Sequence, residues 1–267
     1  MRNILIAVIF ILGINVSADS FQESALKGYF EAEGYSAPGQ NRFAAMIAAK
    51  VDAQRRLLEI IKGAQVTSAT TIENGVLKSD VMISKVKGIV QGARMTARKY
   101  DMRSGTAMIR LAIGYKDFLN KALKDKDFKD AFYQTAKTTT PVFQAVKEEV
   151  ASAEVVYDGL IVDATATEME PAYINRVYSD NKVVYDPTKV PQQVIVERGL
   201  ASYTIDINKA KAILDTYGVK NPLIVKATAT TKLKSDVVIN SADATVVMNS
   251  NDKSGFLESA KIVFVLK

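Results

Sequence analysis

The stretch NRFAAMIAAKVDAQRRLLEIIKG, from Asn41 to Gly63, limits the possible folds of this chain more than any other part. Its apolar residues recur at steps of three and four, which is the period of one face of an α-helix. That face, apolar apart from one glutamine, consists of Phe43, Met46, Ile47, Val51, Gln54, Leu57, Leu58 and Ile61. The pattern predicts a long amphipathic helix that turns this face to the core, with Asn41 as its N-cap and Gly63 as the left-handed residue that ends it.

The opposite face of the predicted helix is charged. Asp52 and Arg56 stand four residues apart with opposite charges, and so do Arg55 and Glu59, a spacing that lets side chains pair along a helix. Arg55 and Arg56 are neighbours on this solvent-facing surface. They are our candidates for contact with a partner.

The segments around this helix predict an antiparallel sheet that helices cover on one face. Strands are expected in four places, namely 28–35, 66–72, 94–100 and 106–115. In the last of these, apolar and polar residues alternate, which indicates one buried face and one solvent-facing face. Ser79 or Asp80 is expected to cap a second helix, and residues 117–136 are expected to form a third.

The N-terminus has the pattern of a secretory signal peptide, which we place at residues 1–18. Arg2 precedes an apolar run from Ile4 to Ile14, and the small residues Val16 and Ala18 stand just before the expected cleavage point. The run is shorter than the ~20 residues that cross a bilayer, so we expect export with cleavage rather than a membrane anchor. No later segment approaches that length, and no cysteine stands at the cleavage point to carry a lipid.

Two domains of ordinary size are expected after the signal peptide. The first, 19–137, contains the elements above. Residues 138–153, which include a Thr-Thr-Thr-Pro sequence, are expected to form a linker with a short helix, and 154–267 a strand-rich second domain. We predict an α+β fold of two domains, each a mostly antiparallel sheet with helices packed on one face.

The second domain shows short strand-like runs between turn signals. Strands are expected at 160–162, 174–178, 182–185, 194–197, 202–205, 223–230 and 261–266, with a helix from Asn208 to about Gly218. The sequence Ser179-Asp180-Asn181 predicts a hairpin between the second and third of these strands. The run 160–162 is apolar throughout, which suits a strand buried on both faces. Residues 77–83, LKSDVMI, are echoed by 233–239, LKSDVVI. Either a strand–helix unit is duplicated or a helix-capping phrase recurs by chance.

Cysteine and histidine are both absent from the sequence. Their absence excludes disulfides, thiol or imidazole nucleophile–base pairs, His-containing triads and Cys/His zinc sites. The sequence also has no glycine-rich phosphate loop, serine elbow or nucleotide fingerprint. We therefore predict a protein that is not an enzyme, with no catalytic residues, no cofactor and no metal.

Carboxylates are the remaining acid–base groups. Glu168 and Glu170 lie in a polar loop, with Asp158 and Asp163 upstream. A carboxylate-based hydrolase would need two such groups in one cleft with separated pKa values. A solvated loop explains this cluster better, so a hydrolase is the least favoured of the functions that we consider.

One run of residues resembles a known family. The run is VDAQRRLLE, 51–59, and it is followed by Gly63, Val66, Ser68, Thr70, Gly88, Gly92 and Tyr100. This pattern is similar to the family of small bacterial envelope lipoproteins that includes the flagellar protein FlgP and the LPP-twenty antigen. The N-terminal domain of the flagellar assembly protein FlgT is a more distant likeness. The match covers about residues 28–116.

The resemblance implies a non-enzymatic protein of the periplasm or of the inner face of the outer membrane, tied to flagellar disks or rings. Members of the family commonly carry a lipidated cysteine, which this chain lacks. We therefore expect an exported protein that is lipoprotein-like without the lipid. Its location would be the periplasm, including sites peripheral to the outer membrane.

Two functions remain in view. The first is a structural or assembly protein of the cell envelope at the flagellar base. It would bind envelope or flagellar proteins, or further copies of itself, through sheet edges and the face around Arg55 and Arg56. The alternative is a periplasmic module that binds an anionic or carbohydrate polymer, motivated by 35 Lys and Arg against 29 Asp and Glu. These positive charges are spread along the chain, so nucleic acid is not expected as a partner.

Overall fold

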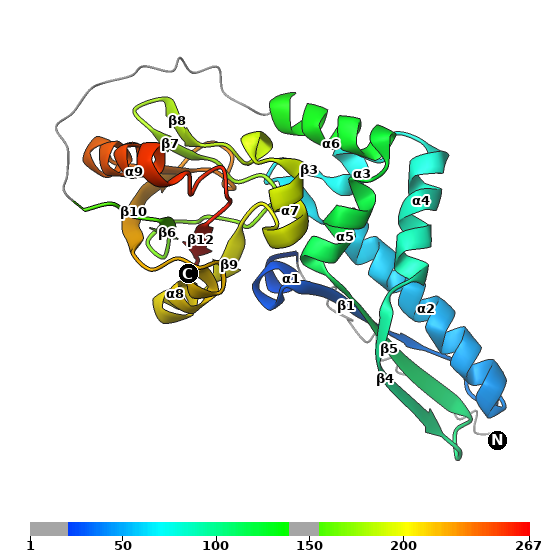
Figure 1. Cartoon of the computed structure of the whole chain (residues 1–267). Coiled ribbons are helices and arrows are strands. Elements are labelled where there is room, and N and C mark those ends of the chain that lie inside the picture. The colour runs from blue at the N-terminus through cyan, green and yellow to red at the C-terminus, as the bar shows by residue number, and fades with distance from the viewer. Residues whose placement is uncertain (1–20, 139–154) are drawn as a thin grey trace, which may run out of the picture.

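The structure, a computed structural model, describes residues 21–138 and 155–267 (Figure 1). The predicted signal peptide and the predicted linker, apart from Thr138, lie outside these residues. An α+β fold with two domains is confirmed, since each half of the chain builds its own main sheet. Within the described ranges, no helix combines the length and the apolar character needed to cross a membrane.

The first domain is a three-stranded antiparallel sheet with a long helix across one face. Its elements are α1 (Phe21–Lys27), β1 (Tyr29–Tyr35), α2 (Arg42–Lys62), β2 (Gln65–Thr67), β3 (Thr70–Thr71), α3 (Ile72–Gly75), α4 (Asp80–Gln91), β4 (Arg94–Asp101), β5 (Thr106–Gly114), α5 (Tyr115–Ala122) and α6 (Lys126–Thr138). The strand order is β1-β5-β4, so β4 lies at an edge. The helix α2 packs mainly on β1 and β5 (Figure 1).

The ends of α2 agree with the prediction, but its buried face does not. The Asn41 side chain accepts a hydrogen bond from the Ala44 N–H at 2.9 Å and so caps the helix, and the Gly63 N–H closes it on the Glu59 carbonyl at 3.0 Å. Gly63 has a φ of −74°, so the left-handed conformation predicted for it is wrong. Toward the sheet, α2 turns a row of fully buried alanines, namely Ala45, Ala49 and Ala53. The predicted stripe is buried only near the C-terminal end of the helix, at Leu57, Leu58 and Ile61.

Phe43, Ile47 and Val51 are instead 77%, 50% and 59% exposed. The physical reason lies in β1, where Gly34 sits directly under the helix. A Cβ atom on Gly34 would lie 2.6 Å from Cα of Ala53, and closer still to the Ala53 nitrogen and the Ala49 oxygen. The strand and the helix therefore approach each other through small residues, and larger side chains would not fit between them.

Two other first-domain predictions were wrong in detail. The expected strand 66–72 is a hairpin of β2 and β3 that continues directly into the short helix α3. The expected helix 117–136 is divided into α5 and α6.

The second domain contains a seven-stranded sheet with the order β8-β7-β11-β10-β6-β12-β9. Its elements are β6 (Gly159–Asp163), β7 (Val177–Ser179), β8 (Lys182–Tyr185), the 3₁₀ helix η1 (Pro187–Lys189), α7 (Gln192–Arg198), β9 (Ser202–Thr204), α8 (Ile207–Thr216), β10 (Pro222–Thr230), β11 (Val237–Ile239), α9 (Ser241–Ser254) and β12 (Ile262–Val265). Four of its six neighbouring pairs run parallel, and only β7–β8 and β10–β11 run antiparallel. The expectation of a mostly antiparallel sheet is therefore wrong for this domain, whose sheet is mixed.

This mixed sheet is covered on both faces, not on one. Ile161 of β6 packs against α8, while its neighbours Leu160 and Val162 face the main core. All three are fully buried, as their apolar run predicted. Parallel strands need crossover connections, which place helices over the faces of the sheet. Residues 194–197, expected as a strand, accordingly belong to the helix α7.

The hairpin between β7 and β8 is confirmed, with Asp180 and Asn181 at φ values of 45° and 62° in its turn. The duplication hypothesis is not supported. Residues 77–83 lead into the helix α4, where the Ser79 side chain accepts the Met82 N–H, whereas 233–239 lead into the strand β11. Two nearly identical segments of the sequence therefore adopt different secondary structures.

The two domains share a continuous hydrophobic core. The ring of Tyr115, at the start of α5, stacks on that of Tyr173 with centroids 4.3 Å apart. The hydroxyls of Tyr115 and Tyr203 donate to the Ala172 carbonyl at 3.3 and 2.6 Å. The Tyr173 N–H in turn donates to the Gln65 carbonyl of β2 at 2.9 Å. These contacts join the domains through packing and hydrogen bonds alike.

A buried ion cluster ties α6 to the second sheet. Arg176 has no exposed surface, and its Nη2 donates to the Ala136 carbonyl at 2.6 Å. Its Nε lies 3.4 Å from Asp186 Oδ1, and its backbone N–H donates to Asp236 Oδ1 at 3.0 Å. Burial raises the pKa of Asp236 to about 6, because the bonds and the charge of Arg176 offset the loss of hydration only in part.

This pKa predicts a pH dependence of stability. The pKa of Asp236 is about 6 in the folded chain and 3.8 ordinarily. Between pH 3.8 and about pH 6, therefore, the folded state keeps a proton on Asp236 that the unfolded state has already released. The free energy of unfolding should therefore fall by up to about 3 kcal/mol from this group as the pH rises from about 4 to about 6. Asp236→Asn should remove that component, as measured by urea unfolding across this pH range.

The exposed carboxylate of Asp215, paired with Lys220 at 3.0 Å, supplies the matched control, since Asp215→Asn should leave the pH profile of the natural protein in place. Equal profiles for Asp236→Asn and the natural protein would contradict the prediction.

Candidate functional site

Part of the first domain projects from the body of the molecule. We call this part the arm, and it comprises residues 35–51, with the first half of α2, and residues 94–111, with β4 and most of β5 (Figure 1). At the end of the arm, the Gly39 and Gln40 N–H groups donate to the carbonyls of Ser104 and Gly105 at 2.8 and 3.2 Å. The helix and the hairpin are thereby fastened together away from the second domain.

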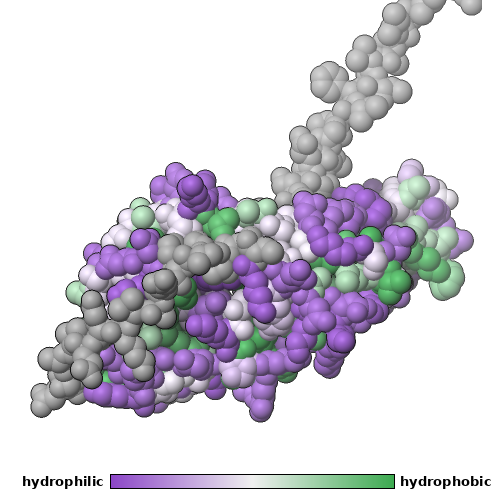
Figure 2. All heavy atoms as spheres, turned by 90° about the horizontal axis from the view of Figure 1, so that it is seen from above, coloured by the Kyte–Doolittle hydropathy of each residue, from purple (hydrophilic) through white to green (hydrophobic). Residues whose placement is uncertain are grey.

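The arm carries an exposed apolar surface. Phe43, Ile47 and Val51 follow one another along α2, and Met102, in the β4–β5 turn, is 87% exposed. Figure 2 shows hydrophobic surface gathered at the end of the molecule where the arm lies. Single exposed apolar residues are common on soluble proteins, but a contiguous group marks an interaction surface. We call Phe43, Ile47 and Val51 the apolar stripe.

A groove separates the start of α2 from β4. It has a volume of about 350 Å³, and its lining residues are Arg42, Phe43, Met46, Met95, Arg98 and Ile109. Four of these are apolar and two are arginines, and no carboxylate is among them. Within the described residues neither arginine forms an ion pair. We call this feature the α2–β4 groove, and it combines an apolar floor with unneutralised positive charge.

The predicted contact residues Arg55 and Arg56 lie on α2 beyond the arm, and both are bound to one carboxylate. Asp52 accepts from Arg55 Nη2 at 2.9 Å and from Arg56 Nε at 2.8 Å, and also from the Tyr35 N–H at 3.1 Å. Burial by itself would raise the pKa of Asp52, but these bonds outweigh it and lower that pKa. The predicted pairing of Asp52 with Arg56 is confirmed, whereas Arg55 pairs with Asp52 and not with Glu59.

Arg56 is also held over the ring of Tyr35, with its guanidinium carbon 5.8 Å from the ring centroid. Arg55 is the more exposed of the two. As partner contacts, Arg55 and Arg56 stay a prediction.

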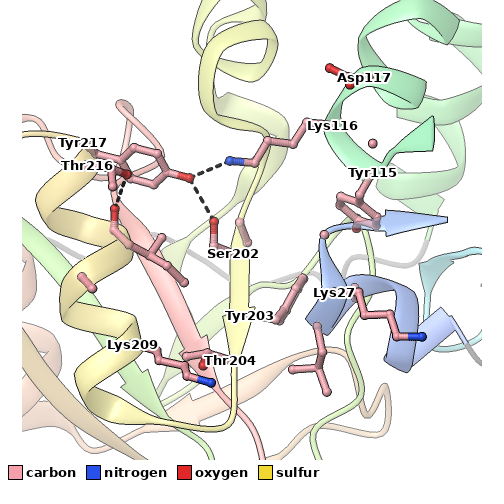
Figure 3. Close-up of a pocket in the computed structure, with 17 residues that line it drawn as sticks. Lys27, Tyr115, Lys116, Asp117, Ser202, Tyr203, Thr204, Lys209, Thr216 and Tyr217 are labelled. Atoms are coloured by element: carbon pink, nitrogen blue, oxygen red, sulfur yellow. Dashed lines mark hydrogen bonds between the residues drawn. The ribbon is translucent and has the colours of Figure 1, made fainter. Parts of the chain in front are cut away.

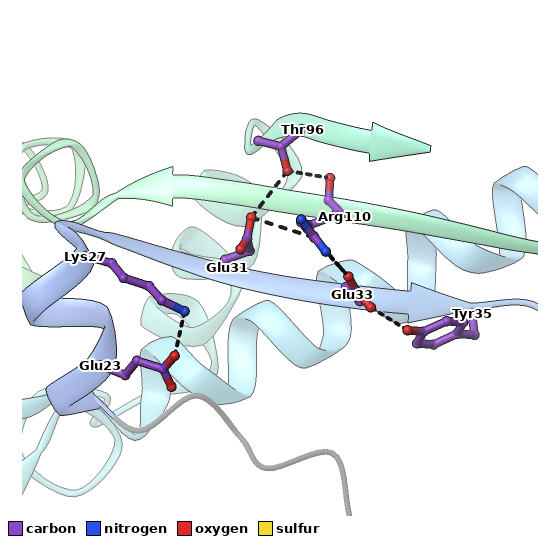
Figure 4. Close-up of polar contacts among 7 residues, drawn as sticks. All are labelled: Glu23, Lys27, Glu31, Glu33, Tyr35, Thr96 and Arg110. Atoms are coloured by element: carbon purple, nitrogen blue, oxygen red, sulfur yellow. Dashed lines mark hydrogen bonds and ion pairs between the residues drawn. The ribbon is translucent and has the colours of Figure 1, made fainter. Parts of the chain in front are cut away.

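On the outer face of the first sheet, Arg110 is neutralised by neighbouring carboxylates. Arg110 Nε donates to Glu33 at 2.9 Å and lies 3.9 Å from Glu31, while the Tyr35 hydroxyl also donates to Glu33 (Figure 4). The hydrogen bond from Tyr35 is the main cause of a lowered pKa at Glu33, and the hydrogen bond from Arg110 lowers this pKa further. This closed network contrasts with the α2–β4 groove, whose arginines have no such partners among the described residues.

A second cavity, of about 730 Å³, lies between the two domains (Figure 3). Lys116 of α5 reaches across it and donates to the Tyr217 hydroxyl at 2.6 Å, and this hydroxyl also bonds Ser202 Oγ at 3.1 Å. Lys209 stands on its wall, as does Lys27, which is paired with Glu23 at 2.7 Å, and Asp117 is the one carboxylate among the lining residues. The cavity is therefore cationic and rich in hydroxyl groups.

The carboxylates considered for hydrolysis serve separate local contacts. Asp158 accepts the N–H groups of Lys220 and Asn221, at 2.8 and 2.7 Å. Asp163 accepts the Thr165 N–H at 3.1 Å, and Glu168 and Glu170 share Lys234, at 3.3 and 3.6 Å. In the described part of the chain, no group of three or more acidic side chains could hold a metal ion.

The second domain provides the link to known proteins. Residues 159–267 match the family described as Treponema pallidum Tp0624, second domain. No curated protein sequence matches the chain. The Tp0624-like segment runs from β6 through β12, so it coincides with the mixed sheet and its helices. The arm and the α2–β4 groove lie outside the matched segment.

Sequence reasoning missed the arm surface. It assigned Phe43 and Ile47 to the core and gave Met95 and Arg98 no role. One signal was present, because the alanine row of α2 has the same helical period as the larger apolar row. A helix with two such rows can bury either of them. The prediction placed the row of larger residues in the core on the basis of hydrophobicity alone.

Proposed function

We propose that this protein is a non-enzymatic structural or assembly protein of the cell envelope, located in the periplasm and associated with the flagellar base. Its arm is the element that docks onto a partner protein. The resemblance of residues 28–116 to the FlgP and LPP-twenty family supports the location and the flagellar association. The family match of the second domain does not bear on either.

The apolar stripe is the observation that carries the docking role. A half-exposed isoleucine and a phenylalanine 77% exposed on one helix face cost free energy in water, and a partner that covers them would recover it. The first half of α2 is already held by its alanine row, so the stripe is not required to hold the helix on the sheet. Binding rather than folding accounts for these residues.

Serine at the stripe should therefore abolish assembly while leaving the fold intact. For Phe43→Ser and Ile47→Ser, the free energy of unfolding should change by less than about 1 kcal/mol. A tagged full chain should lie at discrete envelope positions in cells, and these variants should spread evenly. Val81→Ser is the matched control, since Val81 is 60% exposed on α4, outside the arm.

Even distribution of the unaltered protein, together with normal motility after its deletion, would overturn the proposal. A large loss of stability in Phe43→Ser would show instead that the stripe serves folding.

The interdomain cavity favours a second candidate function, the binding of an anionic or carbohydrate envelope polymer. Lys116 and Lys209 would attract carboxylate or phosphate groups, and Ser202 and Tyr217 offer hydroxyls for a sugar. Sedimentation of the protein with purified cell wall at low salt but not at high salt would support this function. Failure to sediment at low salt would dismiss it.

A further inference from the structure

We propose that the partner supplies an extended acidic segment, which adds to the free edge of β4 as a fourth strand and places apolar side chains in the α2–β4 groove. This inference rests on the proposed docking role and specifies its chemistry. The mode is strand addition, in which backbone hydrogen bonds provide affinity and alternate side chains provide specificity.

The edge of β4 is suited to strand addition. The strand has eight residues, and β5 is its one hydrogen-bonded neighbour among the described strands. Most of its residues are exposed. Its outer N–H and C=O groups therefore form a template that a further strand can pair with.

The charge of this edge selects an acidic partner. The strand β4, RMTARKYD, contains Arg94, Arg98 and Lys99 and one acid, Asp101, whose carboxylate accepts the Arg103 N–H at 2.9 Å in the β4–β5 turn. Arg42 faces the same groove from α2. Pairing of β4 with β4 of a second copy would bring together two strands that each carry net positive charge, which is unfavourable. The charge pattern thus disfavours this self-pairing and favours a partner with carboxylates.

The groove selects alternate apolar residues. Met95 stands opposite the buried Leu111, and Arg98 opposite the buried Ile109, so both belong to the face of β4 on the α2 side. Successive residues of an added strand point to opposite faces. One set of its side chains would therefore reach Met95 and Phe43, while the other set lies over Lys99, which stands opposite Met108.

A membrane surface is the less suitable occupant. The apolar stripe with nearby arginines resembles a surface that binds anionic lipid. Insertion of the β4 edge into hydrocarbon, however, would leave its outer backbone groups without hydrogen bonds, at several kcal/mol for each group. A strand satisfies these groups, and a lipid does not.

Peptide binding to the mature protein tests this inference. The probe is a fluorescent peptide of alternating glutamate and valine that matches the eight residues of β4. One comparison peptide has lysine in place of glutamate, and another is methylated on alternate backbone nitrogens, which removes the donors of one edge. The acidic peptide should bind, more weakly at high salt, and both comparison peptides should bind at least about tenfold more weakly.

Two variants locate the site. Lys99→Glu should weaken binding of the acidic peptide about tenfold and favour the lysine peptide, because it reverses a charge on the face of β4 over which the glutamates would lie. Lys87→Glu, a charge reversal at an exposed position of α4 in the same domain but outside the arm, should change the affinity by less than about twofold. Thermal unfolding of both variants confirms that they are folded.

Three results would overturn the inference. They are equal affinity for the acidic and lysine peptides, full affinity for the methylated peptide, and binding to phosphatidylglycerol–phosphatidylethanolamine vesicles without peptide binding. If the peptide fails to bind but Ile47→Ser still disperses the tagged protein in cells, the docking role stands and strand addition falls. If the peptide binds but the tagged protein is evenly distributed, the envelope assembly role falls instead.

Discussion

Replacing Gly34 with alanine is expected to destabilise the protein by about 3 kcal/mol or more. The new Cβ atom would meet the backbone of α2 at Ala49 and Ala53, including a separation of 2.6 Å from the Ala53 Cα atom. A helix backbone cannot turn aside as a flexible side chain can, so α2 must move off the sheet or the strand must shift. Urea unfolding followed by far-ultraviolet circular dichroism measures the loss.

Gly88→Ala is the matched control for this substitution. Gly88 lies inside α4, and a Cβ atom there would have no heavy atom within 4 Å. Alanine should therefore stabilise the helix by roughly 0.5–1 kcal/mol. If Gly34→Ala proved as stable as the natural protein, the close approach of β1 and α2, and with it the reason for the exposed stripe, would be refuted.

Removal of the buried guanidinium by Arg176→Ala should cost about 3–5 kcal/mol of folding free energy. The substitution leaves the Asp186 and Asp236 carboxylates buried without their cation, and it frees the Ala136 carbonyl that Arg176 Nη2 satisfies at 2.6 Å. The cluster joins α6 of the first domain to the second sheet, since Arg176 and Asp236 immediately precede β7 and β11. Both domains should consequently lose stability together in denaturant unfolding.

A second substitution separates the charge effect from the packing effect. In the Arg176→Ala background, Asp236→Asn removes one uncompensated carboxylate, so the double variant should recover part of the lost free energy. Arg55→Ala, at an exposed ion pair, should cost less than about 1 kcal/mol. A loss below this level for Arg176→Ala, or the absence of any recovery in the double variant, would show that the cluster does not hold the domains together.

Local signals in the sequence predicted much of the first domain correctly. The cap at Asn41, the end of α2 at Gly63 and the strands β4 and β5 all follow from side chains close to each other in the chain. The sequence also predicted the α+β class and the division into two domains correctly. In the second domain, local patterns placed the hairpin at Asp180 and Asn181, but they favoured a strand at 194–197 where the chain forms α7.

The candidate site was beyond such reasoning. Arg55 and Arg56 were visible as a charged pair, but the α2–β4 groove joins residues about fifty positions apart in the sequence, such as Phe43 and Met95. The parallel pairing of the second sheet depends on equally distant segments, since β6 lies between β10 and β12.

The sequence by itself determined where α2 begins and ends, because caps and helical period act within a few residues of each position. The same sequence offers two rows at the helical period, the alanines and the larger apolar residues, and period alone does not choose between them. Only the tertiary structure decided this, through the close approach of Gly34, which admits small side chains and excludes large ones. The larger row was thereby left on the surface, where it forms the apolar stripe.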